Sequence, residues 1–302
     1  MGERPRALEE LGLSAGAVTV GLPVYNGAES LDRALESLCA QTFAGLRILV
    51  SDNASTDETP RIIASWAARD ARVRVHRQPQ NIGAKANFRW VLDAADTPWF
   101  AYAAHDDAWS PNYVEALHRV ITARPGLVMA VPQVVSFLES PHRPTKVRRY
   151  PARLDRLAGA ARLRLALRRS RPSWFYGLFH RHTLLGAVQQ ASALEQVWGE
   201  DVLTILHVLL TGGVTGSNEA IFYNRRGRPT SYLRYAPKTA RERADHYRKF
   251  MRLALAALAA TPLSPLSRAR ALPALWHFAR VIDKSRSILW AALREALSGG
   301  AA

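Results

Sequence analysis

Residues 17–53 read AVTVGLPVYNGAESLDRALESLCAQTFAGLRILVSDN, and this stretch decides the fold. The short apolar run Ala17–Leu22 is typical of a buried strand, and Pro23 ends it. Apolar residues then recur at helical spacing, so Glu29–Ala40 is predicted to be an amphipathic helix. Leu46–Val50 is again short and apolar. The stretch therefore predicts a strand, a helix and a second strand in succession.

The same alternation continues through the first half of the chain. Strands are predicted at Val73–His76, Trp99–Ala103 and Leu127–Val131, and helices at Asp57–Ala68, Phe88–Ala95 and Tyr113–Ile121. Strands that alternate with helices of about ten residues indicate an α/β fold with a mostly parallel, Rossmann-like sheet and helices on both faces. In such sheets ligands bind beyond the carboxyl ends of the strands, where the polar clusters of this sequence fall.

The second half of the chain is predicted to be mainly helical. Arg153–Arg169 is consistent with a basic helix, and Val202–Leu210 with a buried one. From Ala236 to Leu297 the pattern is helical, with two prolines interrupting it around Thr261–Ser267. The chain is therefore predicted to form an α/β domain over residues 1–230 and a C-terminal helical extension over residues 231–302.

Composition narrows the class of protein. The 302 residues are 48 % hydrophobic and 22 % charged, which is typical of a globular chain and not of a disordered one. The single cysteine, Cys39, excludes a disulfide within the chain and is interpreted as core packing. Neither a leader peptide nor an apolar stretch of about 20 residues is visible, so a soluble or peripheral protein is expected, cytoplasmic or on the inner face of a membrane.

The net charge of +16 is unevenly distributed. Residues 143–171 contain eleven Lys or Arg and a single acidic residue, Asp155. A basic segment of this kind fits a solvated arginine-rich surface, an anionic acceptor or a membrane surface, and the sequence leaves these three readings open.

Three polar clusters are candidates for chemistry. Asp106-Asp107 follows the predicted strand Trp99–Ala103, and a divalent cation with substrate phosphates would offset the repulsion of two adjacent carboxylates. A turn that caps the next helix is the competing interpretation. Asp52 follows a strand and could recognise a nucleobase or ribose, or simply form a turn. Asn81–Asn87 contains a glycine before a helix, which favours either an anion site or a helix-start loop.

Taken in order, these pieces resemble the GT-A fold, family 2 glycosyltransferases. The matching motifs are Val18–Asn26, Ile48–Asp57, Asn81-Ile82-Gly83 and Asp106–Pro111, and their order and spacing both fit. The resemblance is clear from Val18 to about Val131. It implies an enzyme that transfers a sugar from a nucleotide-sugar donor with inversion at the anomeric carbon. A bacterial source is expected.

The resemblance also implies roles for particular residues. The nucleotide-binding residues would be Pro23, Val24, Tyr25, Asn26, Asp52, Asn53, Asn81, Gly83, Lys85, Asp106 and Arg226. The metal, Mg²⁺ or Mn²⁺, would be held by Asp106 and Asp107. Ala104 and His105 stand before this pair where the family carries a first carboxylate, and which of the two aspartates is the principal ligand is left open.

Glu200-Asp201 resembles the acidic pair that supplies the family's general base. Asp201 is assigned as the base, with Glu200 as the alternative, because a carboxylate can take the proton of an attacking hydroxyl. The competing interpretation is a purely structural one, in which the two acids form a first turn that the helix dipole stabilises. Arg226, which follows Arg225, would contact the donor diphosphate through a guanidinium–phosphate interaction.

Donor, acceptor and partners are only partly constrained. A UDP-sugar is the expected donor, with dTDP- and GDP-sugars open, and the acceptor is a glycan, a lipid-linked molecule or a small molecule. No nucleic acid is expected, while peripheral membrane contact and a homo-oligomer stay open. One alternative is a sugar-phosphate nucleotidyltransferase, an enzyme that ordinarily has a glycine- and arginine-rich loop after the first strand. The other is a non-catalytic basic protein that binds nucleic acid or membrane.

Overall fold

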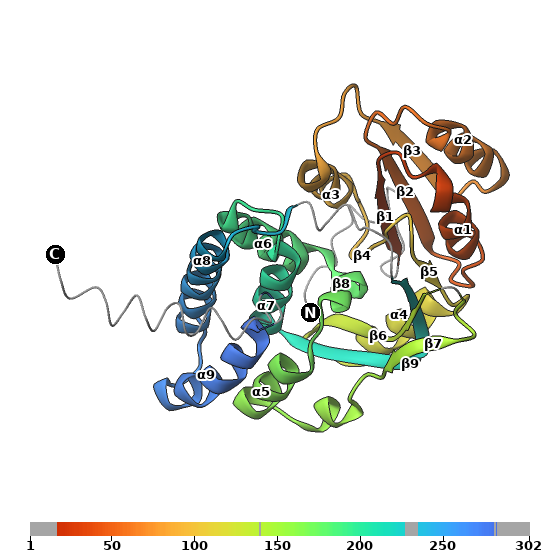
Figure 1. Ribbon diagram of the computed structural model, residues 1–302. Helices are drawn as coiled ribbons and strands as arrows, with labels where there is room; N and C mark the ends of the chain where they lie inside the picture. The colour runs from red at the N-terminus through yellow and green to blue at the C-terminus, as the bar shows by residue number, and fades with distance from the viewer. Residues whose placement is uncertain (1–16, 139, 227–234, 281, 283–302) are drawn as a thin grey trace. The chain divides into compact units, whose positions relative to one another are not determined.

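The computed structural model in Figure 1 describes residues 17–138, 140–226, 235–280 and 282. The chain divides into two compact units. The first comprises residues 1–152, 176–186 and 212–228, and the second comprises residues 153–175, 187–211 and 229–302. This division groups two internal segments with the C-terminal helices and therefore differs from a single boundary at residue 230.

The first unit is built on one mixed sheet. Its strands among the described residues are β1 (Val18–Val24), β2 (Leu46–Asp52), β3 (Val73–Arg77), β4 (Trp99–Tyr102), β5 (Ala108–Trp109), β6 (Leu127–Phe137), β7 (Pro144–Arg148), β8 (Leu178–His180) and β9 (Gly213–Arg225). They lie in the order β3-β2-β1-β4-β8-β6-β9-β5, with β7 paired to β6. Because β1 pairs in parallel with both β2 and β4, and β2 with β3, the carboxyl ends of these strands share one edge.

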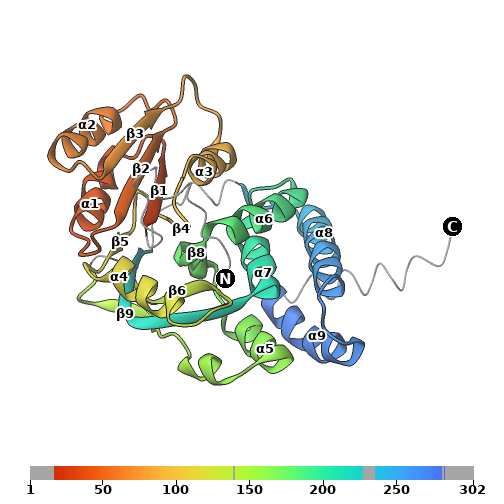
Figure 2. The same cartoon turned by 180° about the vertical axis from the view of Figure 1, so that it is seen from behind.

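Helices cover both faces of this sheet. α1 (Ala28–Cys39), α2 (Thr59–Arg69) and α4 (Tyr113–Thr122) bury their apolar stripes against β1, β2 and β6 in one continuous core. α3 (Ala84–Asp93) lies on the opposite face from α1 and α2, as both views show (Figures 1 and 2). On that side Gly21 leaves room for Phe100, whose ring would lie 2.6 Å from a Cβ at that position.

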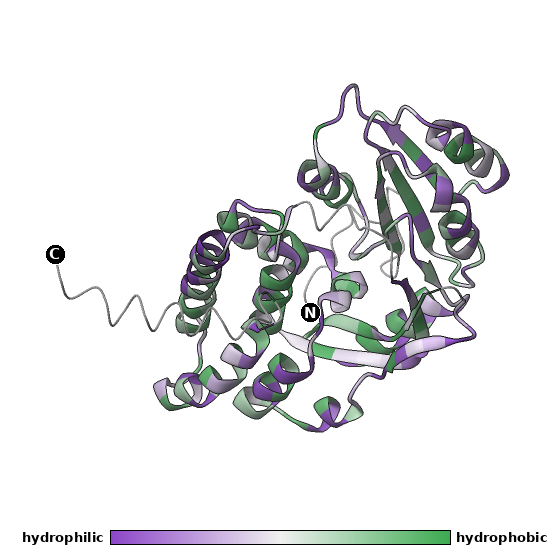
Figure 3. Ribbon diagram, viewed as in Figure 1, coloured by the Kyte–Doolittle hydropathy of each residue, from purple (hydrophilic) through white to green (hydrophobic). Residues whose placement is uncertain are grey.

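The second unit is helical. It contains α5 (Gly159–Arg169), α7 (Glu200–Thr211), α8 (Ala240–Ala259) and α9 (Pro265–Ala279), together with the 3₁₀ turns η2 (Ala152–Arg156), η3 (Pro172–Tyr176) and η4 (Ser192–Leu194) at or inside its segments. α6 (Arg181–Ala191) runs across the boundary between the units. α7 is buried from Val202 to Leu209, and Figure 3 colours most of this stretch as hydrophobic. No helix among the described residues is both long and apolar enough to cross a membrane.

The predicted elements of the first half are present with shifted ends. The helix expected from Asp57 begins at Thr59, because Asp57 accepts a hydrogen bond from the Thr59 N–H instead of joining the helix. The strand expected to end at Val131 continues to Phe137, since its second half pairs with both β7 and β9. The helix predicted over residues 153–169 divides at Leu157–Ala158 into η2 and α5. The part of the helical pattern predicted from Ala236 to Leu297 that follows residue 282 lies outside the described residues.

Candidate functional site

The loops that follow β1 and β2 are bound to each other by hydrogen bonds. The Asn26 N–H donates to Ser55 Oγ (2.9 Å), and Asn26 Oδ1 accepts from the Thr56 N–H (2.9 Å). The Gly27 N–H donates to Thr59 Oγ1 (2.9 Å). These two loops therefore form a single rigid rim at the carboxyl edge of the sheet.

Both loops hold a residue in the left-handed backbone region. Asn26 has φ of 48° and Ala54 has φ of 59°. This conformation is uncommon for residues other than glycine, and strained backbone is found most often at functional sites. Asparagine adopts this conformation readily, so the strain lies at Ala54, and it supports the prediction that this rim binds a ligand.

The end of β1 presents its residues unequally. Pro23 and Val24 are buried, and the Val24 carbonyl accepts from the Asn53 N–H (2.9 Å). Tyr25, by contrast, leaves 39 % of its surface exposed beside Asn26. Of these predicted nucleotide-binding residues, Tyr25 and Asn26 are the ones whose side chains can reach a ligand.

Asp52 ends β2 in a buried position and has two partners. Its Oδ1 accepts from the Ser55 N–H (3.0 Å), and its Oδ2 pairs with the guanidinium of Arg77. Arg77 also donates to the Ser55 carbonyl (2.8 Å). Arg77 lies opposite Asp52 in the β2–β3 register and keeps about half of its side chain exposed. Sequence reasoning missed Arg77, although a cation directly after a predicted strand and level with Asp52 is a usable signal.

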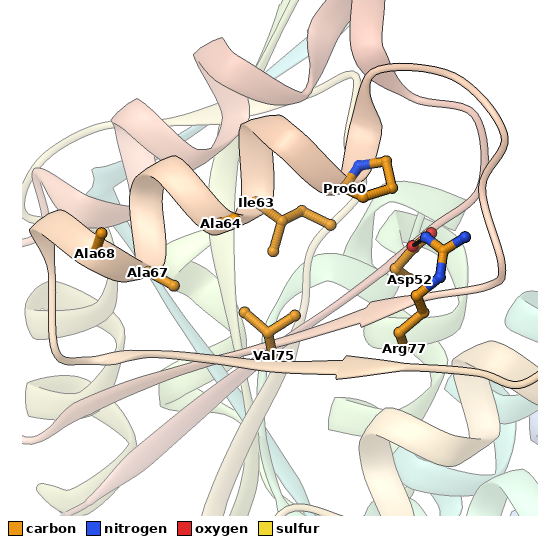
Figure 4. A pocket seen from close by; sticks show the side chains of 8 residues that line it. All are labelled: Asp52, Pro60, Ile63, Ala64, Ala67, Ala68, Val75 and Arg77. Carbon is orange, nitrogen blue, oxygen red and sulfur yellow. Dashed lines mark hydrogen bonds and ion pairs between the residues drawn. The ribbon is translucent and has the colours of Figure 1, made fainter.

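A shallow hollow opens beside this ion pair (Figure 4). The small and apolar side chains of α2 form one wall, Val75 of β3 forms the other, and Asp52 and Arg77 lie at one end. The hollow is therefore apolar along its length and charged at a single end.

Asn53 and Asn81 lock the loop between β3 and α3 onto the end of β2. The Asn53 amide donates to Asn81 Oδ1 (3.0 Å), while the Ile82 N–H donates to Asn53 Oδ1 (2.9 Å). Gly83, at φ of 83°, then donates to Asn81 Oδ1 (2.9 Å) and precedes α3. Asn53 is only 2 % exposed, so it supports the loop, while Lys85 lies half-buried in the first turn of α3.

Asp107 is buried and bound to the end of β9. Its Oδ1 accepts from the Asn224 side-chain amide (3.2 Å) and from the Arg225 N–H (3.3 Å). Burial, followed by the neighbouring Asp106, raises the pKa of the Asp107 carboxyl well above its ordinary value. Asp107 therefore connects two distant parts of the chain and has little surface left for a ligand.

Asp106 occupies a different environment from its neighbour. It is half-buried, and its carbonyl accepts from Arg33 (3.5 Å). The preceding residue, His105, packs against Gly27: a Cβ at Gly27 would lie 2.7 Å from the His105 ring. The turn that carries Asp106 is therefore adjacent to the rim formed by the loops after β1 and β2.

Arg225 and Arg226 follow directly from this connection. β9 ends at Arg225, whose backbone N–H is bound to Asp107, and the Arg226 N–H donates to the Phe137 carbonyl (2.7 Å). The structure thus brings Arg225 and Arg226 next to Asp106-Asp107, although the arginines lie 119 residues further along the chain. A cation pair beside a carboxylate pair can bind an anion and a metal ion together.

The donor set fits a divalent cation only in combination with a ligand. No group of three or more His, Cys, Asp or Glu side chains gathers within the described ranges. Mg²⁺ and Mn²⁺ prefer oxygen and commonly use one or two carboxylates with substrate phosphates. Because Asp107 is committed to Asn224 and Arg225, Asp106 is the carboxylate that fits such a role.

Glu200 and Asp201 belong to the second unit, at the first turn of α7. The preceding Gly199 has φ of 83°, and a Cβ there would lie 2.7 Å from Ile282 and 3.4 Å from His246 Nε2. His246 is 4 % exposed, and burial lowers its pKa, with Lys249 as a further cause. α8 therefore packs directly against the turn that presents the acidic pair.

The structure agrees with the interpretation of Cys39 as a core residue, and it places His207 in the core as well. Cys39 packs against the main core, and burial raises the pKa of its thiol to about 12, which excludes a thiolate nucleophile near neutral pH. His207 lies within the buried face of α7, and burial lowers its pKa.

Comparison with known proteins identifies the class. The family model for glycosyl transferase family 2 matches residues 19–185, more than half of the chain. Staphylococcus aureus TarS 1–349, solved with UDP-GlcNAc, superposes with a TM-score of 0.66 at 17 % identity over 93 % of this chain and 77 % of that TarS fragment. The fold is therefore the GT-A fold that the sequence predicted, and the chain belongs to glycosyl transferase family 2.

Two further similarities are more limited. A mannosyltransferase of Pyrobaculum calidifontis, solved with GDP-Man and Mn²⁺, superposes with a TM-score of 0.54 at 19 % identity over 94 % of this chain and 88 % of its own. An uncharacterized glycosyltransferase of Rickettsia prowazekii is 31 % identical over 98 residues, which are 32 % of this chain and 30 % of the relative. The chain spans about a quarter to a third of the length of the curated relatives that it matches.

Proposed function

We propose that the protein is a glycosyltransferase that moves a sugar from a nucleoside-diphosphate sugar to an acceptor hydroxyl. The observation that carries this proposal is the single connected edge that links Asp52, Asn26, Asp106 and Arg225 through hydrogen bonds and packing contacts. Membership of family 2 supports it. Among the possible donors, we propose a UDP-sugar.

The base and ribose of the donor are assigned to the loops after β1, β2 and β3. Tyr25 offers an exposed ring for stacking, and the half-exposed guanidinium of Arg77, which is anchored by the buried Asp52, offers donors for the polar edge of a base. Arg77 holds the Asp52 carboxylate in place. The rim is already ordered by its internal hydrogen bonds, so binding needs little further loss of conformational entropy.

The diphosphate is assigned to Asp106, Arg225 and Arg226. Asp106 would hold Mg²⁺ or Mn²⁺ together with phosphate oxygens, and the bound metal would stabilise charge on the departing nucleoside diphosphate. The two guanidinium groups add charge-assisted hydrogen bonds to the phosphates. Asp107 fixes the backbone from which Arg225 projects, and it is thus a positioning residue.

The proton of the acceptor hydroxyl is assigned to Asp201, with Glu200 as the alternative base. A neutral hydroxyl is a poor nucleophile, and a carboxylate within hydrogen-bond reach accepts its proton as the new glycosidic bond forms. A single displacement of this kind inverts the anomeric centre. Gly199 and His246 shape the turn from which both carboxylates emerge.

Calorimetric titration of UDP, GDP and dTDP, each with Mn²⁺, Mg²⁺ or EDTA, tests this assignment. We expect one nucleotide to bind with a metal ion, and we expect Asp106→Asn to lose that binding. Glu36→Gln, which changes an exposed carboxylate on α1, serves as the matched control. Absence of binding for every nucleotide would remove the transferase proposal, and formation of a nucleotide sugar from a nucleoside triphosphate and a sugar phosphate would favour a nucleotidyltransferase.

A further inference from the structure

The consecutive helices α8 and α9 carry an exposed surface of mixed apolar and cationic residues. From Leu253 to Ser267 the sequence contains no charged residue. Leu255 and Leu266 are nevertheless 38 % and 60 % exposed, at the end of α8 and the start of α9. Figure 3 colours the end of α8 as hydrophobic. We call the exposed residues of 252–280 the α8–α9 surface.

The exposed residues of α9 lie on one helical face. They recur three or four positions apart, at Leu266, Ala269, Arg270, Pro273, Trp276, His277 and Arg280. The opposite face is buried within the second unit through Ala271, Ala274, Leu275 and Phe278. Trp276, at 46 % exposure, is thus displayed next to cationic side chains while the helix keeps a complete buried face.

The charge of this surface has one sign. Residues 252–280 contain Arg252, Arg268, Arg270 and Arg280 and no Asp or Glu. Arg268 is partly committed, since its Nε donates to the Leu263 carbonyl (2.8 Å). Arg252, Arg270 and Arg280 are exposed, and they flank the uncharged tip on both sides.

From these features we infer that the α8–α9 surface binds an anionic lipid bilayer. A bilayer offers phosphate charges to the arginines and an apolar phase to Leu255 and Leu266 at the same time. Tryptophan side chains are favoured at the boundary between the two. The protein would lie on the membrane with the α8–α9 surface at the interface and without crossing the bilayer.

Other occupants fit this surface less well. A second copy of the chain, related by a two-fold axis, would place arginines of one copy against those of the other, with no carboxylate in residues 252–280 to compensate. Nucleic acid would satisfy the arginines, but it would leave both exposed leucines without an apolar partner. The lipid assignment does not rest on the proposed transferase activity, because neither nucleotide nor acceptor contributes to it.

Co-sedimentation of the full chain with vesicles tests this inference. We expect binding to phosphatidylcholine vesicles that contain phosphatidylglycerol, weak binding to pure phosphatidylcholine, and weaker but measurable binding to the anionic vesicles at high salt. Each of Arg270→Gln and Arg280→Gln should weaken the partition constant about fivefold. Leu266→Ser with Trp276→Ser should weaken it at every salt concentration, because the apolar contribution is not screened.

Matched controls come from the first unit. Val75→Ser with Leu138→Ser removes exposed apolar side chains, and Arg61→Gln removes an exposed cation, so neither change should alter vesicle binding. All of these sites are exposed, and circular dichroism checks that each variant is folded. Equal binding by the wild type and the α8–α9 variants would overturn the inference. Self-association that these variants abolish, without vesicle binding, would assign the surface to a second copy.

Discussion

The two adjacent aspartates should differ in what their mutation changes. Mutation of Asp107 should change the stability of the fold, and mutation of Asp106 should change metal-dependent nucleotide binding. Asp107→Asn keeps an oxygen in the place where Asn224 and Arg225 donate, and it removes a buried charge. Its free energy of unfolding should stay within about 1 kcal/mol of the wild type. Asp107→Ala deprives both donors of their acceptor and should lower the free energy of unfolding by about 2 kcal/mol. The loss is not larger because Asn224 is half-exposed and regains part of its hydrogen bonding from water.

The pH dependence gives this prediction a sign. The pKa of Asp107 is raised in the folded protein above its ordinary 3.8. Folding therefore favours the protonated carboxyl, and this contribution to stability is lost as the pH rises through the folded-state pKa. The stability of Asp107→Asn relative to the wild type should consequently increase with pH, as urea unfolding at pH 5 and pH 8 would measure.

Asp106→Asn completes the comparison. It should change the free energy of unfolding by less than about 1 kcal/mol, because the side chain is only half-buried and loss of its charge relieves repulsion with Asp107. It should abolish metal-dependent nucleotide binding in calorimetry, which Asp107→Asn should retain. The reasoning is refuted if Asp107→Asn loses that binding while Asp106→Asn keeps it.

Three further predictions address the remaining assignments. Arg226→Gln should weaken UDP binding about tenfold and leave uridine binding unchanged, because uridine lacks the phosphates that a guanidinium contacts, whereas Arg124→Gln should change neither. Asp201→Asn should lower the rate of sugar transfer at least about 100-fold and retain UDP affinity, and an unchanged rate would move the base to Glu200. The pKa of His246 is lowered below 6.5 in the folded state, so protonation favours the unfolded chain and stability should fall as the pH drops from 7 to 5. Urea unfolding should show a shallower fall for His246→Gln, and an identical pH profile would contradict the burial of a neutral imidazole.

The sequence predicted those parts of the fold in which local pattern and tertiary environment agree. β1, α1 and β2 have apolar residues at the period of their own structure, and they pack into one core. β9 was missed because its thirteen residues include two glycines and two asparagines, and its burial follows the pairing with β6 and not a period of two. A strand that neighbours define cannot be recognised from its own residues.

The candidate site also contains residues that the local sequence predicts and residues whose roles depend on distant parts of the chain. Asp52 and Asp106 were recognisable because each follows a strand that its own sequence predicts. The difference between Asp106 and Asp107 was not, because it depends on Asn224, which lies 117 residues away in the chain. Arg77 was overlooked for a related reason: its value comes from the β2–β3 register, which places it opposite Asp52.

The left-handed backbone at Ala54 limits how this protein can be made more heat-resistant. A non-glycine residue in that conformation costs about 1 kcal/mol, so a glycine there would relieve strain. Glycine would also increase the entropy of the unfolded chain by a free-energy equivalent of about 0.5 to 1 kcal/mol, which cancels most of the gain. In a selection for thermal stability, we therefore expect no substitutions in the rim formed by the loops after β1 and β2. Stabilising substitutions should occur on surfaces remote from it.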